Sequence, residues 1–452
     1  MYRTEQDSMG PVQVPAERSW GAQTQRSLTN FAIGRETMPE EIIRGMALVK
    51  LASAKANCRL GTLDEGRAEA IEAVCRQILA GGLQEEFPLK VWQTGSGTQT
   101  NMNLNEVIAH RANARAGEGL IHPNDHVNRS QSSNDTFPSA MRIAAAEAVT
   151  ALLPEVSALE ESFAGLERRW PELITLGRTH LQDAVPIRFA QMVSGWRVML
   201  EQCRAQLKAA LPGLCALPLG GTAVGTGLNA PEGFDRLSAA LVAEETGLPF
   251  VTAENKFHAL TSLDAFVFAH GAMKALAADL MKIANDLRWL ASGPRGGIGE
   301  VRLPANEPGS SIMPGKVNPT QCEAVTMVAV QVMGNDATLG IAASQGNFQL
   351  NVFLPVSAYN FLQSARLLTD VLRSFRRNCV DGLEPVEETM ALHLGRSLMN
   401  VTALSPVIGY DKAANVAKYA YEQDLTLAEA AQALGYMGLE EARAALDPGK
   451  MV

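Results

Sequence analysis

Apolar residues recur every three or four positions through the middle of the chain, a spacing typical of long helices that bury one face. The clearest run extends from Leu263 to Leu290, where steps of three and four residues alternate. A second apolar stripe extends from Phe189 to Cys203, and similar patterns cover residues 321–339 and 355–379. This region is predicted to be a bundle of long helices, and core packing is a sufficient explanation for both stripes.

The pattern changes on either side of this central region. Residues 1–129 combine short helical segments with turn signals, which predicts a loop-rich helical N-terminal domain. Residues 130–386 contain the long helices, and residues 387–452 contain shorter helices punctuated by Gly, Pro and Asp. The sequence therefore predicts a mainly α protein of three domains. Some long helices are apolar on more than one side, so we expect neighbouring subunits to contribute helices to a common core.

The composition is that of a globular protein with a large core: 452 residues, 46% hydrophobic and 19% charged. The net charge of -9, without a long run of one sign, argues against nucleic acid or an anionic membrane as the main partner. The six cysteines are scattered singly, without the spacing of a zinc or iron–sulfur site. No export signal and no apolar run of about 18 residues is visible. We expect a cytoplasmic protein without a metal or another cofactor.

Between two helical patterns lies the segment GSSIMPGKVNPTQ, residues 309–321. Its two glycines and two prolines interrupt regular structure, so the segment is predicted to be a shaped loop that carries two adjacent serines and Lys316. A solvated turn is the simpler interpretation of such a loop. The helical pattern that resumes at Thr320 favours an anion site, because N–H groups at a helix start bind anionic groups well.

Three further polar clusters accompany this loop. The segment GSGTQTNMN, residues 95–103, offers hydroxyl and amide groups on a glycine-hinged loop, although a helix cap explains it as well. The segment SSNDTFP, residues 132–138, lies just ahead of a long helix, and a cap explains only one of its first three polar residues. The segment GRTHLQDAVP, residues 177–186, places His180 in a loop between two helices. A lone histidine is more often structural than catalytic, but its polar surroundings favour a chemical role.

Together these clusters provide hydroxyls, amides, one lysine, one histidine and Glu323, but no metal cage and no nucleotide-phosphate motif. Such groups suit the removal of a proton next to a carboxylate, which creates a doubly charged aci-carboxylate that needs nearby donors. Ser310 can be the base only if its pKa falls far below the ordinary value, and Lys316, loop N–H groups and a helix N-terminus are expected to stabilise its anion. His180, oriented by Glu323, is the candidate for proton transfer at the other carbon.

These motifs resemble the active-site segments of the fumarase/aspartase superfamily, and of class II fumarases in particular. GSSIMPGKVNPTQ is similar to the superfamily's signature loop, and GSGTQTNMN, HPNDHVN, SSNDTFP and GRTHLQDAVP resemble the other segments in the same order. Aspartases typically carry Gln at the position of His180 and Ala at the position of Gly315, so both residues are of the fumarase kind. The resemblance covers nearly the whole chain.

The resemblance implies specific roles for the polar residues. Ser310 matches the catalytic base on a flexible loop, His180 matches a second catalytic group that acts through bound water, and Glu323 matches its partner. The substrate-binding positions that it implies are Ser96, Gly97, Thr98, Ser132, Ser133, Asn134, Thr179, Ser311, Lys316, Val317 and Asn318.

The resemblance also implies a secondary dicarboxylate site at His122, Pro123, Asn124 and Asp125. Family members can carry basic residues just before this histidine, whereas residues 119–121 carry none. The sequence therefore lacks one feature that is expected of an anion site there.

By this resemblance, the expected activity is the reversible, metal-free hydration of fumarate to (S)-malate. The expected fold is a three-domain fumarase/aspartase-like fold, and the expected assembly is a homotetramer with a shared helical core and active sites built from three subunits. The expected partner is a small dicarboxylate, not nucleic acid or a membrane. Two alternatives stay open: an ammonia-lyase acting on aspartate, which shares the fold and the base, and a catalytically silent helical scaffold. The four polar clusters argue against the scaffold.

Overall fold

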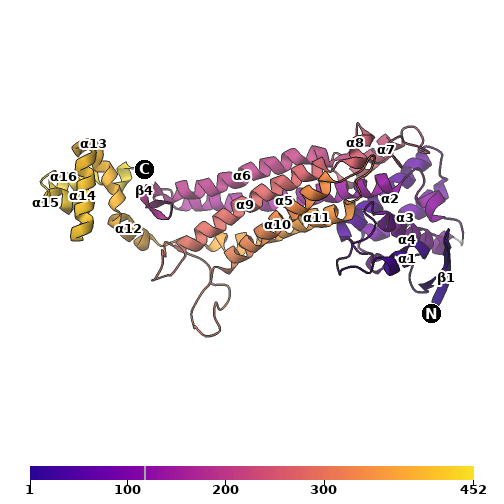
Figure 1. Cartoon of the computed structure of the whole chain (residues 1–452), viewed down its shortest axis with the longest axis horizontal. Coiled ribbons are helices and arrows are strands. Elements are labelled where there is room, and N and C mark those ends of the chain that lie inside the picture. Colours follow the sequence, from indigo (N-terminus) through magenta and orange to yellow (C-terminus); the bar gives the residue numbers. More distant parts are fainter. Residues whose placement is uncertain (117–118) are drawn as a thin grey trace. The chain divides into compact units, whose positions relative to one another are not determined.

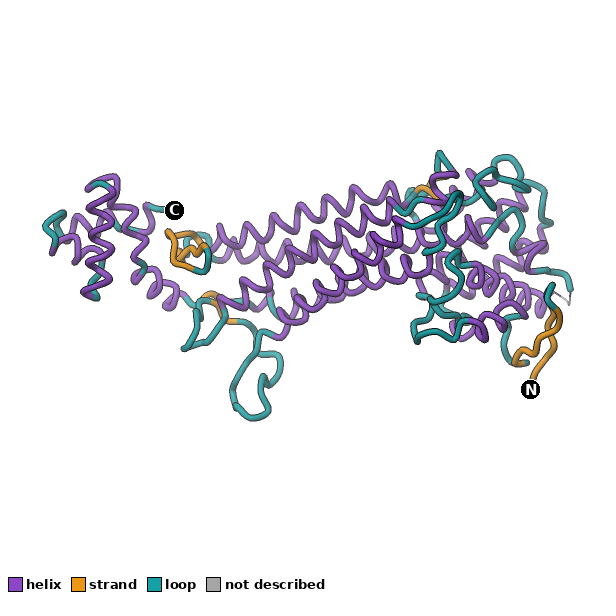
Figure 2. The backbone as a smooth tube through the Cα atoms, in the orientation of Figure 1, coloured by secondary structure: helices purple, strands orange, loops and turns teal. Residues whose placement is uncertain are grey.

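The computed structural model describes residues 1–116 and 119–452, and the fold is mainly α, as predicted. Within these residues the strands form only two-stranded sheets (Figure 2). The chain falls into two compact units: unit 1 comprises Met1–Leu153, Ala205–Ala277 and Val330–Thr369, and unit 2 comprises Pro154–Arg204, Ala278–Ala329 and Asp370–Val452. The three-domain division at residues 129 and 386 stays a prediction.

Long helices follow the apolar patterns of the sequence. They are α5 (Ser133–Arg169), α6 (Phe189–Leu214), α9 (Asp264–Leu290), α10 (Thr320–Ser344) and α11 (Leu354–Asn378). The apolar stripe of α9 is buried along its whole length, which confirms that it packs in a core. On α6, Val193, Trp196 and Leu200 are buried, whereas Met192 and Met199 are only half-buried.

Unit 1 begins with the antiparallel strands β1 and β2, which pair from Tyr2↔Pro15 to Asp7↔Gly10. A short parallel pair, β5 and β6, lies later in the chain. The elements of unit 1 besides the long helices are β1 (Tyr2–Asp7), β2 (Gly10–Pro15), α1 (Ala22–Asn30), α2 (Glu40–Arg59), α3 (Glu65–Leu79), the 3-10 turn η1 (Gln84–Glu86), α4 (Thr98–Ala116), the π-helical turn η2 (Pro123–Val127), β5 (Ala216–Leu217), α7 (Phe234–Thr246), β6 (Val251–Thr252) and α8 (Lys256–Thr261).

Helix α2 is central to unit 1, because α3 and α7 both pack along it (Figure 1). Its first turn carries Glu40 and Glu41, which interact favourably with the helix dipole. Gly45 permits close packing on α5, since a Cβ atom there would lie 2.6 Å from the carbonyl oxygen of Ala140. Most of α2 is apolar and buried, and Lys50 is buried with it.

Unit 2 contains an antiparallel hairpin of β3 and β4, with an irregular register between Leu176 and Arg178. Its C-terminal helices form a hydrophobic cluster of their own, with Leu404, Val416 and Ala430 fully or almost fully buried. The elements of unit 2 besides the long helices are β3 (Ile174–Thr179), β4 (Gln182–Arg188), β7 (Val301–Arg302), η3 (Val380–Gly382), β8 (Glu384–Pro385), α12 (Glu387–Arg396), η4 (Leu398–Leu404), α13 (Ser405–Ile408), α14 (Tyr410–Gln423), α15 (Leu427–Ala433), α16 (Leu439–Ala445) and η5 (Pro448–Lys450).

Candidate active site

The segment GSGTQTNMN lies at the start of α4, which begins at Thr98. The prediction that the whole segment is a loop is therefore wrong, because only its first three residues precede the helix. The hydroxyl oxygens of Ser96 and Thr98 lie 2.8 Å apart. Gly97 is required between them, since its φ is +73° and a Cβ atom would fall 2.3 Å from the ring of Phe137. The backbone thus holds two hydroxyls at a helix N-terminus, a position that favours anions.

Asn101 connects α4 to the start of α5 and is fully buried. Its Nδ2 atom donates to Ser133 Oγ at 3.1 Å and to Asn128 Oδ1 at 3.2 Å. The Thr136 hydroxyl donates to Asn101 Oδ1 at 3.1 Å. Because the oxygen of Ser133 is the acceptor in this contact, its hydroxyl hydrogen is left to donate to a ligand.

Ser132, Ser133 and Asn134 have different tasks, as the sequence suggested. Ser132 caps α5, because its Oγ accepts from the backbone N–H of Asn134 at 3.2 Å. Helix α5 begins at Ser133, so Ser133 and Asn134 belong to the helix and do not precede it. The Asn134 side chain donates to the carbonyl oxygen of Ala223 at 2.8 Å.

Two buried ionisable residues support this cluster, and the sequence analysis missed both. Asp135 accepts from the backbone N–H groups of Gly220 at 3.0 Å and Thr222 at 2.8 Å. Burial raises the pKa of Asp135 to about 6, although these hydrogen bonds act to lower it. Burial lowers the pKa of the Lys50 ammonium to about 7, opposed by the charge of Asp135. The available signal was a lysine within the apolar run MALVKLASA.

The HPND segment forms the π-helical turn η2. His122 Nδ1 accepts from the backbone N–H of Asp125 at 3.2 Å, and both side chains are exposed. Arg67 of α3 reaches this segment and donates to the carbonyl oxygen of Leu120 at 2.8 Å. Residues 119–121 carry no basic side chain, and Arg67, from a distant part of the sequence, supplies one near this turn. Desolvation and the Arg67 charge lower the pKa of the neighbouring His126.

The GSSIMPGKVNPTQ segment is an irregular loop that ends at the start of α10, as predicted. The Gly309 N–H donates to the carbonyl oxygen of Lys316 at 2.9 Å, and Asn318 Nδ2 donates to the Gly309 carbonyl oxygen at 2.7 Å. A Cβ atom on Gly309 would lie 2.4 Å from the Lys316 oxygen, so only glycine permits this closure. The loop therefore has a closed base, while residues 311–317 are exposed.

Ser310 lies half-buried just inside this closed base. Its Oγ accepts from the backbone N–H groups of Met313 at 3.0 Å and Ile312 at 3.3 Å. Donors directed at a hydroxyl oxygen stabilise its anionic form. This geometry provides part of the stabilisation that a serine base requires.

His180 occupies the tip of the β3–β4 hairpin, not a simple loop between helices as predicted. Thr179 pairs with Gln182, so His180 and Leu181 form a two-residue turn. Their φ values are +56° and +59°, in the left-handed region that such hairpin turns require. All four side chains are exposed.

Buried Glu300 anchors the hairpin that carries His180. The Arg178 guanidinium donates to both of its carboxylate oxygens, at 2.8 and 2.6 Å, and His393 Nδ1 of α12 lies 2.8 Å from Oε1. The Glu300 hydrogen bond raises the pKa of Arg178. Charge-assisted bidentate pairs of this kind fix orientation. The sequence analysis missed Glu300, because nothing in GGIGE marks the acid as buried.

A lyase family model matches residues 10–334, and a model described as fumarase C C-terminus matches residues 401–452. A class II fumarate hydratase of Ralstonia nicotianae is 56% identical over 100% of this chain and 99% of its own length. The chain belongs to the class II fumarate hydratase family. The family resemblance that the motifs indicated is confirmed.

Further members of the class II fumarate hydratase family also match this chain over nearly its whole length. A Pseudomonas putida class II fumarate hydratase is 58% identical and covers 98% of this chain and 96% of that protein. The crystal structure of class II fumarase from Schistosoma mansoni superposes with a TM-score of 0.97 at 43% identity, over 100% of this chain and 99% of that chain. The predicted fumarase/aspartase-like fold is therefore confirmed.

The three predicted catalytic residues, Ser310, His180 and Glu323, all belong to unit 2. Glu323 is exposed in the first turn of α10. Across residues 1–116 and 119–452, no hydrogen bond joins any two of these three side chains. By contrast, the predicted binding residues of unit 1 make local hydrogen bonds, which join Ser96 to Thr98, Ser132 to Asn134, and Ser133 to Asn101.

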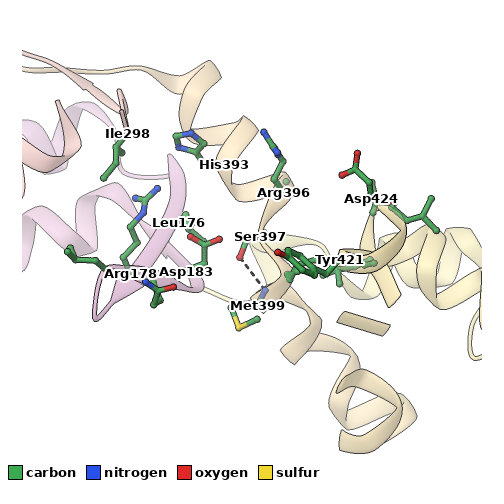
Figure 3. A pocket seen from close by; sticks show the side chains of 18 of the residues that line it. Leu176, Arg178, Asp183, Ile298, His393, Arg396, Ser397, Met399, Tyr421 and Asp424 are labelled. Atoms are coloured by element: carbon green, nitrogen blue, oxygen red, sulfur yellow. Dashed lines mark hydrogen bonds between the residues drawn. The ribbon is translucent and has the colours of Figure 1, made fainter. Parts of the chain in front are cut away.

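A large cavity in unit 2, of about 1070 Å³, lies beside the His180 hairpin. Figure 3 shows Arg178 and Asp183 of the hairpin and His393 and Arg396 of α12 around it. None of the predicted catalytic or substrate-binding residues lines this cavity.

A metal site needs several acidic, histidine or cysteine side chains close together. In the part of the chain that the structure describes, no three of them are grouped so that they can hold a metal ion. All six cysteines are free thiols.

Proposed function

We propose that this chain catalyses the reversible hydration of fumarate to (S)-malate, with Ser310 as the carbon base. Membership of the class II fumarate hydratase family supports the reaction. The single observation that supports the role of Ser310 is the pair of backbone N–H groups directed at its Oγ, at 3.0 and 3.3 Å. They stabilise the alkoxide form, which is the form that removes a proton.

In the malate direction, Ser310 removes a proton from the methylene carbon. The electron pair of that C–H bond moves into the neighbouring carboxylate and gives the aci-carboxylate. The C–O bond of the hydroxyl then breaks as His180, acting through a bound water and paired with Glu323, delivers a proton. The products are fumarate and water, so atoms and charge balance.

Neutral donors and one cation suit the two carboxylates of the substrate. We assign one carboxylate to the Ser310 loop, through Ser311, Lys316, Val317 and Asn318. The other carboxylate is assigned to the hydroxyl and amide groups of unit 1 and to Thr179, and the unit 1 residues are Ser96, Gly97, Thr98, Ser132, Ser133 and Asn134. Anions are well bound by such preorganised N–H and O–H groups.

We further propose that the site is completed in a homotetramer by residues of three subunits. Helix α10 supports this assembly, because its apolar side chains Met327, Val330 and Ile341 are 69, 62 and 66% exposed in one chain. Within the described residues α10 is the one helix long and apolar enough to cross a membrane, a test that core helices also pass. Contiguous exposed apolar residues on such a helix favour burial against other subunits.

A secondary dicarboxylate site at His122, Pro123, Asn124 and Asp125 is also proposed. The Arg67 guanidinium near this turn supports it, because it supplies a positive charge beside otherwise neutral and acidic groups. We also propose that the protein is cytoplasmic, as its sequence predicts.

The deciding experiment is an absorbance assay for fumarate after mixing the purified protein with malate or with aspartate. We expect fumarate from malate and none from aspartate, with the same rate after treatment with a chelator. Fumarate from aspartate alone would identify an ammonia-lyase, and saturable dicarboxylate binding without turnover would identify a silent scaffold. Loss of activity on chelation would contradict a metal-free reaction.

A further inference from the structure

The buried Lys50 side chain is linked by hydrogen bonds to the hydroxyl and amide cluster of unit 1. The side chain is 0% exposed, and Nζ donates to Asn128 Oδ1 and to Gln131 Oε1, both at 2.9 Å. In the chain outside residues 117–118, no carboxylate accepts a hydrogen bond from it. A buried cation is costly without a compensating anion.

Asp135 and Cys75 are the ionisable groups that act on the Lys50 charge. Asp135 of α5 attracts it, but the Asp135 oxygens already accept from the N–H groups of Ser132, Gly220 and Thr222. Cys75 of α3 is a buried thiol whose pKa is raised to about 12, so it is neutral. Burial lowers the pKa of Lys50 to about 7, so an anion that binds nearby favours its charged form.

A fixed sequence of hydrogen bonds leads from Lys50 to a predicted substrate-binding residue. An ammonium group can only donate, so Asn128 must present its oxygen to Lys50. The same oxygen accepts from Asn101 Nδ2, and this Nδ2 atom also donates to Ser133 Oγ. Ser133 is therefore left with its hydroxyl hydrogen as a donor toward a ligand.

We infer that Lys50 is a positioning residue for dianion binding, which orients the Asn128–Asn101–Ser133 donors and whose ammonium form the bound substrate favours. This inference rests on the proposed function of the cluster as a dicarboxylate site. It assigns to Lys50 an effect on substrate affinity and leaves the proton transfers to other residues.

The first test replaces Lys50 by a neutral side chain of similar length. Lys50→Met is expected to raise KM for malate by about tenfold or more, with a smaller change in kcat, because a hydrogen-bonded charge is lost from the binding cluster. Lys55→Met is the matched control: Lys55 lies on the same helix, and its ammonium pairs with Glu245 at 3.3 Å and Glu72 at 3.8 Å. The KM of the Lys55→Met variant for malate is expected to stay within about twofold of the wild-type value.

A second variant keeps Lys50 and neutralises its charge in place. Asn128→Asp preserves the size of the side chain and its acceptor oxygen, and it gives the ammonium a carboxylate partner. It is expected to fold with an unchanged or raised melting temperature and to show a raised KM, a combination that a purely structural role of Lys50 does not produce. This variant keeps the inference testable if Lys50→Met fails to fold.

Titration calorimetry with succinate, a dicarboxylate that is not hydrated, gives the same comparison without turnover. Weaker succinate binding by folded Lys50→Met and by Asn128→Asp supports the inference. Wild-type affinity in either folded variant would overturn it. An inactive wild-type protein that still binds succinate would refute the proposed reaction while leaving this comparison intact.

Discussion

The hydroxyl and amide cluster of unit 1 and the two segments of unit 2 with proposed catalytic roles are built in contrasting ways. In unit 1, Asn101 is fully buried, and its amide is fixed by three hydrogen bonds to Asn128, Ser133 and Thr136. In unit 2, His180 lies at an exposed hairpin tip and Ser310 on a largely exposed loop. The groups proposed to bind the substrate are held by hydrogen bonds within the chain, whereas the groups proposed for proton transfer lie on exposed segments.

Ser310→Ala tests the reactive side of this contrast and carries the largest expected effect. We expect kcat to fall by about a thousandfold or more, because the base is removed while the donors that stabilised it remain. The measurement is malate turnover, accompanied by circular dichroism and size determination to show an unchanged fold. Ser194→Ala, whose hydroxyl donates to its own helix at 2.7 Å, is the control with wild-type turnover. Near-normal turnover of Ser310→Ala would remove Ser310 from the mechanism.

His180→Asn tests the hairpin tip and should lower kcat by about a hundredfold. Asparagine tolerates the left-handed backbone of this turn, so the hairpin is expected to persist. Leu181→Asn, in the neighbouring position of the same turn, is the control and should keep most of the activity. If both variants lose activity equally, the turn has a structural role only.

Glu300→Gln asks whether the exposed hairpin depends on its buried anchor. Removing one partner of a buried ion pair typically costs about 3 kcal/mol, so we expect a clearly lower melting temperature together with reduced kcat. The control is Glu384→Gln, since Glu384 pairs with Arg302 at 3.4 Å in an exposed position and should change little. Equal melting temperatures of the two variants would show that Glu300 is not an anchor.

The smallest expected effect concerns Asp135, which is buried in unit 1, and it depends on pH. Burial raises the pKa of Asp135 to about 6, above its unfolded value near 3.8. The folded state therefore binds an extra proton in this window, and the stability from this group is lost as pH rises from about 4 to 6, by about 2 kcal/mol. The difference in melting temperature between wild type and Asp135→Asn should shrink over this range. A constant difference would refute the raised pKa.

Much of the fold was predictable, because the periodic pattern of apolar residues that marks a buried helix face lies within a short stretch of sequence. The stripe from Leu263 to Leu290 became the buried face of α9, and the restart of helical periodicity at Thr320 became the start of α10. The hairpin around His180 was missed, because strands of six and seven residues between long helices give little periodic signal. Its turn needs left-handed backbone at two residues that are not glycine.

The sequence by itself determined the helical class, the four polar clusters and their family, because motif residues are chemically specific and adjacent in the chain. Tertiary structure decided which groups support them: Lys50 behind Asn128, Glu300 beneath Arg178, and Arg67 beside the His122 turn. These partners lie tens of residues or more apart along the chain, so only folding brings them within hydrogen-bond distance. The role of a buried charged side chain depends on neighbours that no local sequence pattern specifies.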